Sequence, residues 1–133
     1  MRFPPSLSRR FRSDEGSAIA EFALVTPLLL LIALAILQLA LALYVRTTLT
    51  AAAAEGARGA ALAGSDLHVG ESRARDMVST SMAGGAIRDV HGRLAIVGGV
   101  PVVEMTVTSD LPLIGILGPV PMSVTGRAVV ERP

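Results

Sequence analysis

The sequence predicts an α+β membrane protein with one long N-terminal transmembrane helix that continues outside the membrane, a second short helix, and a small antiparallel sheet of two or three strands. Three observations predict this fold class. An apolar run without charge extends from Phe22 to Val45, an Ala-rich segment follows it directly, and the apolar period becomes two in the C-terminal third. We expect a basic segment on the cytoplasmic side over 1–16, a long helix over 17–63 with its span at about 22–45, and a small extracytoplasmic α+β domain over 64–133.

The apolar run is long enough to cross a membrane. At a rise of about 1.5 Å per residue it would form a helix about 36 Å long, and a bilayer's hydrocarbon core is about 30 Å thick. A cleaved secretory signal has an apolar region of only about 7 to 15 residues. The segment therefore predicts a retained membrane anchor.

The arginines around this span predict its orientation. Four arginines precede it within the first 15 residues, whereas Arg46 alone follows it closely. Basic residues remain preferentially on the cytoplasmic side of a membrane. The N-terminus is therefore expected in the cytoplasm and the residues after about 46 outside it.

The segment after the span, residues 46–64, is rich in Ala, the best helix former. Nothing separates it from the span, so one helix is expected from about Ser17 to about Ala63. The small residues here, Gly56 and Gly59 among them, permit close approach of another helix or a sheet. A neighbouring element is therefore expected to pack against this part of the helix.

A second, weaker helix is predicted over Asp66–Ala83, where Gly84 and Gly85 end it. Four apolar residues are its expected anchors: Val69, Met77, Val78 and Met82. This helix is predicted to pack through those side chains, with its charged residues in water.

Alternating apolar residues predict two longer strands over Val102–Thr108 and Val120–Glu131, and a short third one over Leu94–Val97. Val103, Met105 and Val107 would share the buried face of the first. The helix leaving the membrane is the expected cover for this face. The apolar loop at 109–119 either folds back to complete the core or contacts lipid or another subunit.

The composition and the motifs argue against several functions. The net charge of +1 gives no case for nucleic-acid binding, and the chain has no Cys to supply a thiolate. His68 and His91 are expected to be surface residues, and no glycine-rich phosphate loop follows a strand. We therefore expect no catalytic residue, metal site, cofactor or small-molecule substrate.

The N-terminal edge of the span carries a recognisable pattern. Gly16 is followed by four small or apolar residues and then by Glu21 and Phe22; Pro27 lies inside the span, and Glu55-Gly56-Ala57-Arg58 follows it. In these motifs the chain resembles the TadE-like family of minor pilins, or pseudopilins, of the Tad/Flp tight-adherence systems. Two departures are Gln38-Leu39-Ala40, where family members often have an acidic residue before Phe-Gly, and Ala54, where they often have Arg.

The resemblance implies a non-enzymatic structural component in the assembly of an adhesive pilus, located in the bacterial cytoplasmic (inner) membrane. A prepilin peptidase would cleave after Gly16, remove residues 1–16 as a basic cytoplasmic leader, and make Ser17 the new N-terminus. Glu21 would then pair with the Ser17 ammonium of a neighbouring subunit, with Phe22 beside it. The implied partners are the membrane, the prepilin peptidase, other pilins or pseudopilins, and the Tad assembly proteins.

Two simpler interpretations stay open at this stage. Glu21 can merely mark the water-facing end of an anchor, where the positive end of the helix dipole favours a carboxylate. The whole chain can also be an uncleaved single-span envelope protein whose outer domain binds a partner or a ligand.

Overall fold

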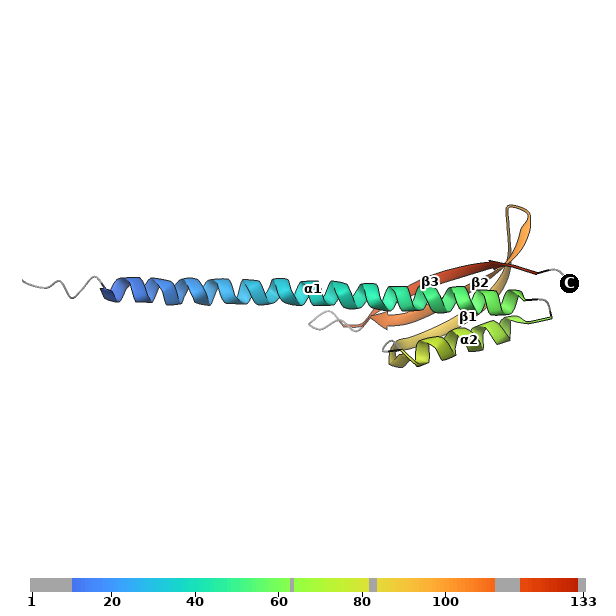
Figure 1. The fold of residues 1–133 in the computed structure, drawn as a ribbon, viewed down its shortest axis with the longest axis horizontal. Coiled ribbons are helices and arrows are strands. Elements are labelled where there is room, and N and C mark those ends of the chain that lie inside the picture. The colour runs from blue at the N-terminus through green and yellow to red at the C-terminus, as the bar shows by residue number, and fades with distance from the viewer. Residues whose placement is uncertain (1–10, 63, 82–83, 112–117, 132–133) are drawn as a thin grey trace, which may run out of the picture. The chain divides into compact units, whose positions relative to one another are not determined.

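The computed structural model describes residues 11–62, 64–81, 84–111 and 118–131. They form two compact units, Met1–Leu37 and Gln38–Pro133, which are described separately. The elements, shown in Figure 1, are α1 (Phe11–Ala61), α2 (Leu67–Ser79), the 3-10 turn η1 (Gly84–Ala86), β1 (Ile87–Val97), β2 (Val100–Leu111) and β3 (Val120–Val129). The predicted combination of a long apolar helix, a short helix and a small antiparallel sheet is confirmed.

The helix α1 begins at Phe11, earlier than the expected start near Ser17, so Gly16 lies inside it. The five residues before Gly16 include neither proline nor a β-branched side chain, and nothing in them stops a helix from extending. At the other end α1 stops at Ala61, close to the expected Ala63. Gly64 follows with a φ of 79°, the left-handed conformation in which helix ends commonly use glycine.

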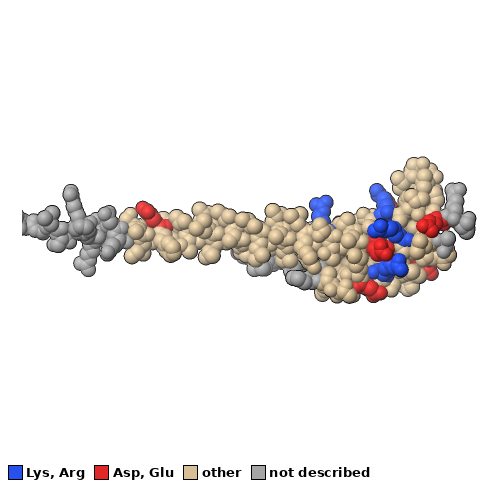
Figure 2. All heavy atoms as spheres, viewed as in Figure 1, with Lys and Arg blue, Asp and Glu red and all other residues tan. Residues whose placement is uncertain are grey.

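In the first unit the side chains of α1 are open to the surroundings. From Ser17 to Leu37 every residue is exposed apart from Thr26, which is half-buried. Within the described residues the structure contains one helix long and apolar enough to cross a membrane, spanning Gly16–Ala61. Figure 2 shows a long stretch of this helix with neither acidic nor basic side chains on the visible face.

The sheet of the second unit is antiparallel with strand order β1-β2-β3. Gly98 and Gly99 join β1 to β2 with φ values of 59° and 80°. Two consecutive positive φ angles are typical of the tight hairpin turn that matches the twist of the strands. The third strand is confirmed, but β1 has 11 residues and begins at Ile87 instead of Leu94.

The core of the second unit lies between this sheet and two helices. Figure 1 shows α1 and α2 running along the sheet. Val103, Met105 and Val107 of β2 are buried as expected, together with Val45 and Leu49 of α1. The other buried apolar residues that form this core are Ala52, Ala53, Ala57, Ala60, Ala61, Ala74, Val78, Val90 and Leu111. The expected cover of the sheet by α1 is therefore confirmed.

Helix α2 packs differently from the expectation. Val69 and Met77 are 50% and 41% exposed, so neither is an anchor, and Met82 lies outside the described residues. Val78 is buried as predicted, and the other buried residues of α2 are Gly70 and Ala74, which were not expected to pack. The two helices approach so closely that only small side chains fit between them, which a search for large apolar residues does not detect.

Glycines permit the closest contacts of the core. A methyl group at Gly56 would come within 2.8 Å of both the Gly70 carbonyl oxygen and the Ala74 Cβ. A methyl group at Gly126 of β3 would overlap backbone atoms of Ala53 and Ala54. The small residues that predicted a close neighbour for α1 therefore meet both α2 and β3. Of the apolar loop at 109–119, residues 112–117 lie outside the described residues, whereas Leu111 belongs to the core.

Candidate processing and assembly site

The residues expected at the processing site lie on the exposed surface of α1. Gly16, Ser17, Glu21 and Phe22 are all exposed, and Phe22 has 72% of its surface open. The Ser17 hydroxyl donates a hydrogen bond to a Glu21 carboxylate oxygen at 3.3 Å. Residues four apart lie on the same side of a helix, one turn from each other. The Glu21 carboxylate can therefore reach groups at position 17.

Gly16 itself has open space around it. In the part of the chain that the structure describes, no heavy atom outside the immediate chain surroundings of Gly16 lies within 4 Å of where a Cβ would be. A side chain would therefore fit in the folded chain, and packing does not explain the glycine. Glycine inside a helix costs about 1 kcal/mol relative to alanine, so this position is one of the easier places to unwind α1.

Pro27 is also inside α1, near the start of the apolar run. Proline has no N–H and removes one hydrogen bond of the helical ladder, which weakens a helix at that point. Membrane helices tolerate it where neighbouring groups satisfy the freed carbonyl. The structure shows α1 continuing through Pro27 as one helix.

The second family motif, Glu55-Gly56-Ala57-Arg58, lies at the junction of α1 with α2 and β2. Glu55 forms an ion pair with Arg58 at 3.6 Å and a second pair with Arg73 of α2 at 3.4 Å. Gly56 faces α2 and Met105, and Ala57 is fully buried. The charged residues of these pairs are exposed, and such pairs contribute little to stability. The motif therefore acts mainly by permitting close packing of the helices.

A carboxylate that the sequence did not single out links α2 to the sheet. Glu71 accepts a hydrogen bond from the Gly92 backbone N–H of β1 at 2.8 Å, and the rings of His68 and His91 approach it at 3.4 and 3.8 Å. The Gly92 N–H lowers the pKa of Glu71, the partial burial of the carboxyl opposes this, and the two imidazoles lower it further. Both histidine side chains are exposed, as expected.

The outer face of the sheet carries a second charged group that joins all three strands. Arg93, Glu104 and Arg127 occupy one row across the sheet. The Arg127 Nε lies 2.6 Å from one Glu104 oxygen, and Arg93 pairs with the other. The hydrogen bond from Arg127 lowers the pKa of Glu104, and Arg93 contributes in the same direction against the effect of burial. A buried carboxylate is satisfied in this way by charges on both sides.

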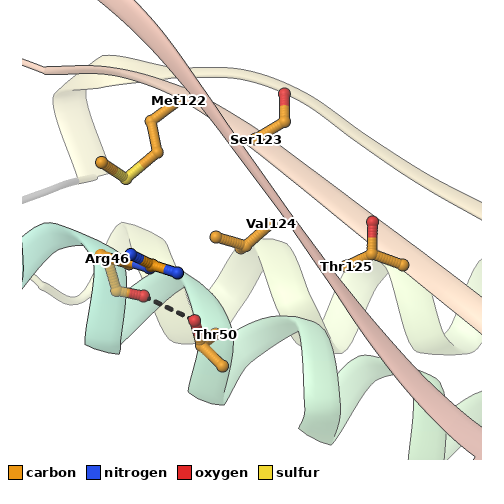
Figure 3. Close-up of a pocket in the computed structure, with 6 residues that line it drawn as sticks. All are labelled: Arg46, Thr50, Met122, Ser123, Val124 and Thr125. Carbon is orange, nitrogen blue, oxygen red and sulfur yellow. Dashed lines mark hydrogen bonds between the residues drawn. The ribbon is translucent and has the colours of Figure 1, made fainter.

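The described residues contain no group of three or more His, Cys, Asp and Glu side chains able to hold a metal ion. A groove of about 520 Å³ lies between α1 and β3 and is open to solvent. Figure 3 shows Arg46 and Thr50 on its α1 side, and Met122 and Val124 directed toward α1 from β3. The Ser123 and Thr125 hydroxyls point away from α1 (Figure 3), so no set of polar groups converges in this groove as in a catalytic site.

The fold and the exposed apolar helix are consistent with a single-pass membrane protein that carries a small α+β domain. A family model described as TadE-like protein matches residues 16–58, about a third of the chain. This match confirms the resemblance over these residues, and the TadE-like family is a structural, pilus-associated family. No curated protein and no solved structure matches the chain.

Proposed function

We propose that this chain is a TadE-like minor pilin or pseudopilin, a structural component in the assembly of a Tad/Flp-type adhesive pilus. In this proposal it is made as a precursor in the inner membrane, with its N-terminus in the cytoplasm and its C-terminal domain outside. A prepilin peptidase removes the leader after Gly16. Its other partners are further pilins or pseudopilins and the Tad assembly proteins.

One observation carries the proposal: an ionisable side chain, Glu21, directly precedes the exposed apolar run of α1, within reach of position 17. The match to the TadE-like family model begins at Gly16, which supports Ser17 as the first residue of the mature chain. A carboxylate in or near lipid is costly unless it has a partner.

Cleavage would supply that partner. It creates a free ammonium group on Ser17, and the Ser17–Glu21 contact indicates that the carboxylate can meet a group at this position in its own helix. The same carboxylate can meet the ammonium of a neighbouring chain when two helices pack side by side. At the low dielectric of a lipid or protein interior this pair is much stronger than in water, and it would define the register between subunits.

Because Gly16 lies inside a helix, cleavage after it also requires a local change of the backbone conformation. Because α1 is continuous from Phe11, the peptidase must unwind it around the scissile bond before the backbone can enter an extended cleft. Glycine lowers the free-energy cost of that local unwinding by about 1 kcal/mol relative to alanine. Removal of the leader also removes the arginines that hold the N-terminus in the cytoplasm.

The cleavage is tested by intact-mass measurement of the chain extracted from membranes of cells that contain the peptidase. We expect a mature chain that begins at Ser17, and expect Gly16→Leu to leave the full-length precursor. The recovery of uncleaved wild-type chain alongside a processed major pilin would contradict the proposal.

The role of Glu21 is tested separately from cleavage. Glu21→Gln keeps the size of the side chain but removes its charge, so we expect normal membrane insertion and at least about a tenfold loss of sheared pili. The matched control is Glu55→Gln, which removes an exposed charge from the second unit. Equal pilus yields from the two variants would contradict a pairing role for Glu21.

The unbroken helix across Gly16 favours one alternative: an uncleaved single-span envelope protein whose outer domain binds a partner or a ligand. That protein would show the same mass with and without the peptidase. Gly16→Leu would also leave its function unchanged, because the glycine has no packing role in the folded chain.

A further inference from the structure

The three-stranded sheet has a free edge along β3. The direction of its backbone groups follows from the neighbouring strands. The Gly92 N–H of β1 bonds to Glu71, so it points away from β2. Gly92 is opposite Met105, and Met105 is opposite Gly126. In an antiparallel ladder the hydrogen-bonded pairs alternate, so Met105 must bond toward β3 and exchange its hydrogen bonds with Gly126.

The odd-numbered residues of β3 therefore direct their N–H and C=O groups outward. Two hydrogen bonds just beyond the end of the strand agree with this alternation. The Val130 N–H bonds inward to the Pro101 carbonyl, and the Glu131 N–H bonds outward to the Ala61 carbonyl of α1. Among the described residues no backbone partner is present for the outward groups of β3. The free donors belong to Ser123, Thr125, Arg127 and Val129, and all four residues are exposed.

The two edges of the sheet differ in how many of their outward backbone groups have a partner. At the β1 edge the Glu71 side chain covers the outward Gly92 N–H. At the β3 edge, Pro121 has no N–H, so one outward donor is missing near the start of the strand. Just beyond the end of β3, the outward Glu131 N–H is bonded to the Ala61 carbonyl. Between them the described residues leave the edge unprotected. An unprotected edge strand is a ready template for another strand.

The groove of about 520 Å³ lies beside the same part of β3. A strand added to the edge would direct every second side chain toward α1, into this groove next to Met122 and Val124. Arg46 lines the groove (Figure 3), and in the part of the chain that the structure describes no carboxylate forms an ion pair with it. A side chain that enters here would meet an apolar wall and an uncompensated positive charge.

We propose that the β3 edge binds an extended acidic segment of a partner protein, which adds to the sheet as a fourth strand. Main-chain hydrogen bonds to Ser123, Thr125 and Arg127 hold the segment, as in other cases of strand addition. An acidic side chain of the segment pairs with Arg46 in the groove. Its side chains on the opposite face continue the hydroxyl pairs Thr106–Thr125 and Thr108–Ser123, which measure 3.0 and 2.8 Å.

A second copy of this chain fits the edge poorly. Residues 120–129 include no Asp or Glu, so the β3 strand of another copy has no carboxylate to offer Arg46. The β1 edge of another copy is already occupied in part by Glu71. The partner segment therefore comes from a different protein. The proposal depends neither on leader cleavage nor on the pilus, so its test can fail independently of theirs.

The test uses the full chain in nanodiscs and a synthetic peptide of about nine residues, in which valine alternates with threonine and glutamate replaces two valines. Amide hydrogen exchange is measured residue by residue with and without the peptide. We expect at least about a tenfold slowing at Ser123, Thr125 and Arg127, while the inward amides of Val124 and Gly126 are already protected. No slowing at the outward amides with saturating peptide would overturn the proposal.

Two substitutions at one position separate the backbone from the side chain. Thr125→Pro removes an outward N–H that β2 does not use, and Thr125→Ala removes only the hydroxyl. We expect the peptide's protection of Ser123 and Arg127 to be lost in Thr125→Pro and kept in Thr125→Ala, with the two variants equally folded by circular dichroism. Equal protection by the peptide in both variants would overturn strand addition.

The charge preference is tested with a second peptide that has lysine in place of glutamate. We expect about tenfold weaker binding of the lysine peptide to the wild-type chain, and Arg46→Gln should remove the difference. The matched control, Arg75→Gln, alters an exposed arginine of α2 and should leave it unchanged. Protection of the outward amides that appears without peptide, when two chains share a nanodisc, would overturn the proposal in favour of self-association.

Discussion

The two parts of α1 are both α-helical, but the first exposes large apolar side chains and the second buries small ones. In the first unit its large apolar residues are exposed, with Leu24 at 77% and Ile36 at 64%. From Val45 to Ala61 the buried residues are mostly alanines, and Ala52, Ala53 and Ala57 have no exposed surface. Large apolar side chains suit a lipid environment that fits any shape, whereas methyl groups suit a rigid neighbour at close distance.

Hydrophobicity alone therefore does not locate the packed part of this helix. Apolar area buried from water stabilises by about 25 cal/mol per Å². Alanine buries little area per residue, so the second unit relies on the number and closeness of its contacts. Its core is therefore expected to respond strongly to added volume, whereas the exposed apolar segment should respond strongly to added charge.

The largest expected effect comes from adding volume where β3 meets α1. Gly126→Val should destabilise the second unit by more than about 3 kcal/mol, because the new side chain meets the backbone of Ala53 and Ala54, which cannot rotate away. Urea unfolding of the full chain in detergent, followed by circular dichroism, measures the change. Membrane extraction should be unaffected.

The control for this change is Gly85→Ala, where no heavy atom of the described residues beyond the adjacent ones in the chain lies within 4 Å of the added methyl group. Its unfolding free energy should remain within about 0.5 kcal/mol of the wild type. If Gly126→Val were equally mild, the contact between α1 and β3 would be looser than the structure shows, and the contrast between the two parts of the helix would fail.

A charge in the exposed apolar segment should have the next largest effect. Leu31 is 63% exposed in the structure, and Leu31→Arg replaces it with a charged guanidinium. Insertion of the variant helix into a membrane should cost about 3 kcal/mol more than insertion of the wild type. An insertion assay with a glycosylation site beyond the helix measures the inserted fraction. Leu31→Ile is the control for shape. An unchanged inserted fraction for the arginine variant would show that this surface does not face lipid.

The smallest effect concerns the carboxylate that joins α2 to β1. The pKa of Glu71 in the folded chain is lowered, chiefly by the Gly92 N–H, so it lies below the unfolded value of about 4.3. The stabilisation is therefore fully present above about pH 4.3 and is lost as the pH falls through the folded pKa. Glu71→Gln should lower the urea midpoint at pH 7 and reduce its further decrease in acid.

Glu71→Asp provides the control, since it keeps the charge but is too short to reach Gly92 in the same way. It should resemble Glu71→Gln at pH 7. The lowered pKa of Glu104 leaves some acid sensitivity in both variants. A wild-type pH profile in Glu71→Gln would mean that this hydrogen bond does not contribute to the stability of the folded unit.

The strongest periodic signals in the sequence predicted their elements well. Val103, Met105 and Val107 alternate with polar residues, and their burial in β2 follows from that alternation alone. The length of β1 was underestimated because only two residues before Leu94, Val90 and Gly92, are buried in this strand. A glycine at a buried position carries no hydrophobic signal, although it permits the approach of Met105 and Leu67.

The candidate sites were predictable to different degrees. Glu21 and Gly16 stand out because a charge and a glycine border a long apolar run, a local pattern that needs no tertiary structure. The roles of Glu71 and Arg46 depend on which strand lies beside which helix. They could not be assigned before the pairing of β1 with β2 and β3 with β2 was known.

The bond from the Glu131 N–H to the Ala61 carbonyl, at 2.8 Å, fastens the end of β3 to the end of α1. In the second unit the strands run alongside this helix (Figure 1), so a tensile load applied along residues 38–61 acts in shear on their contacts. Contacts loaded in shear resist together instead of opening one after another. The small domain is therefore built to remain folded while its helix is pulled.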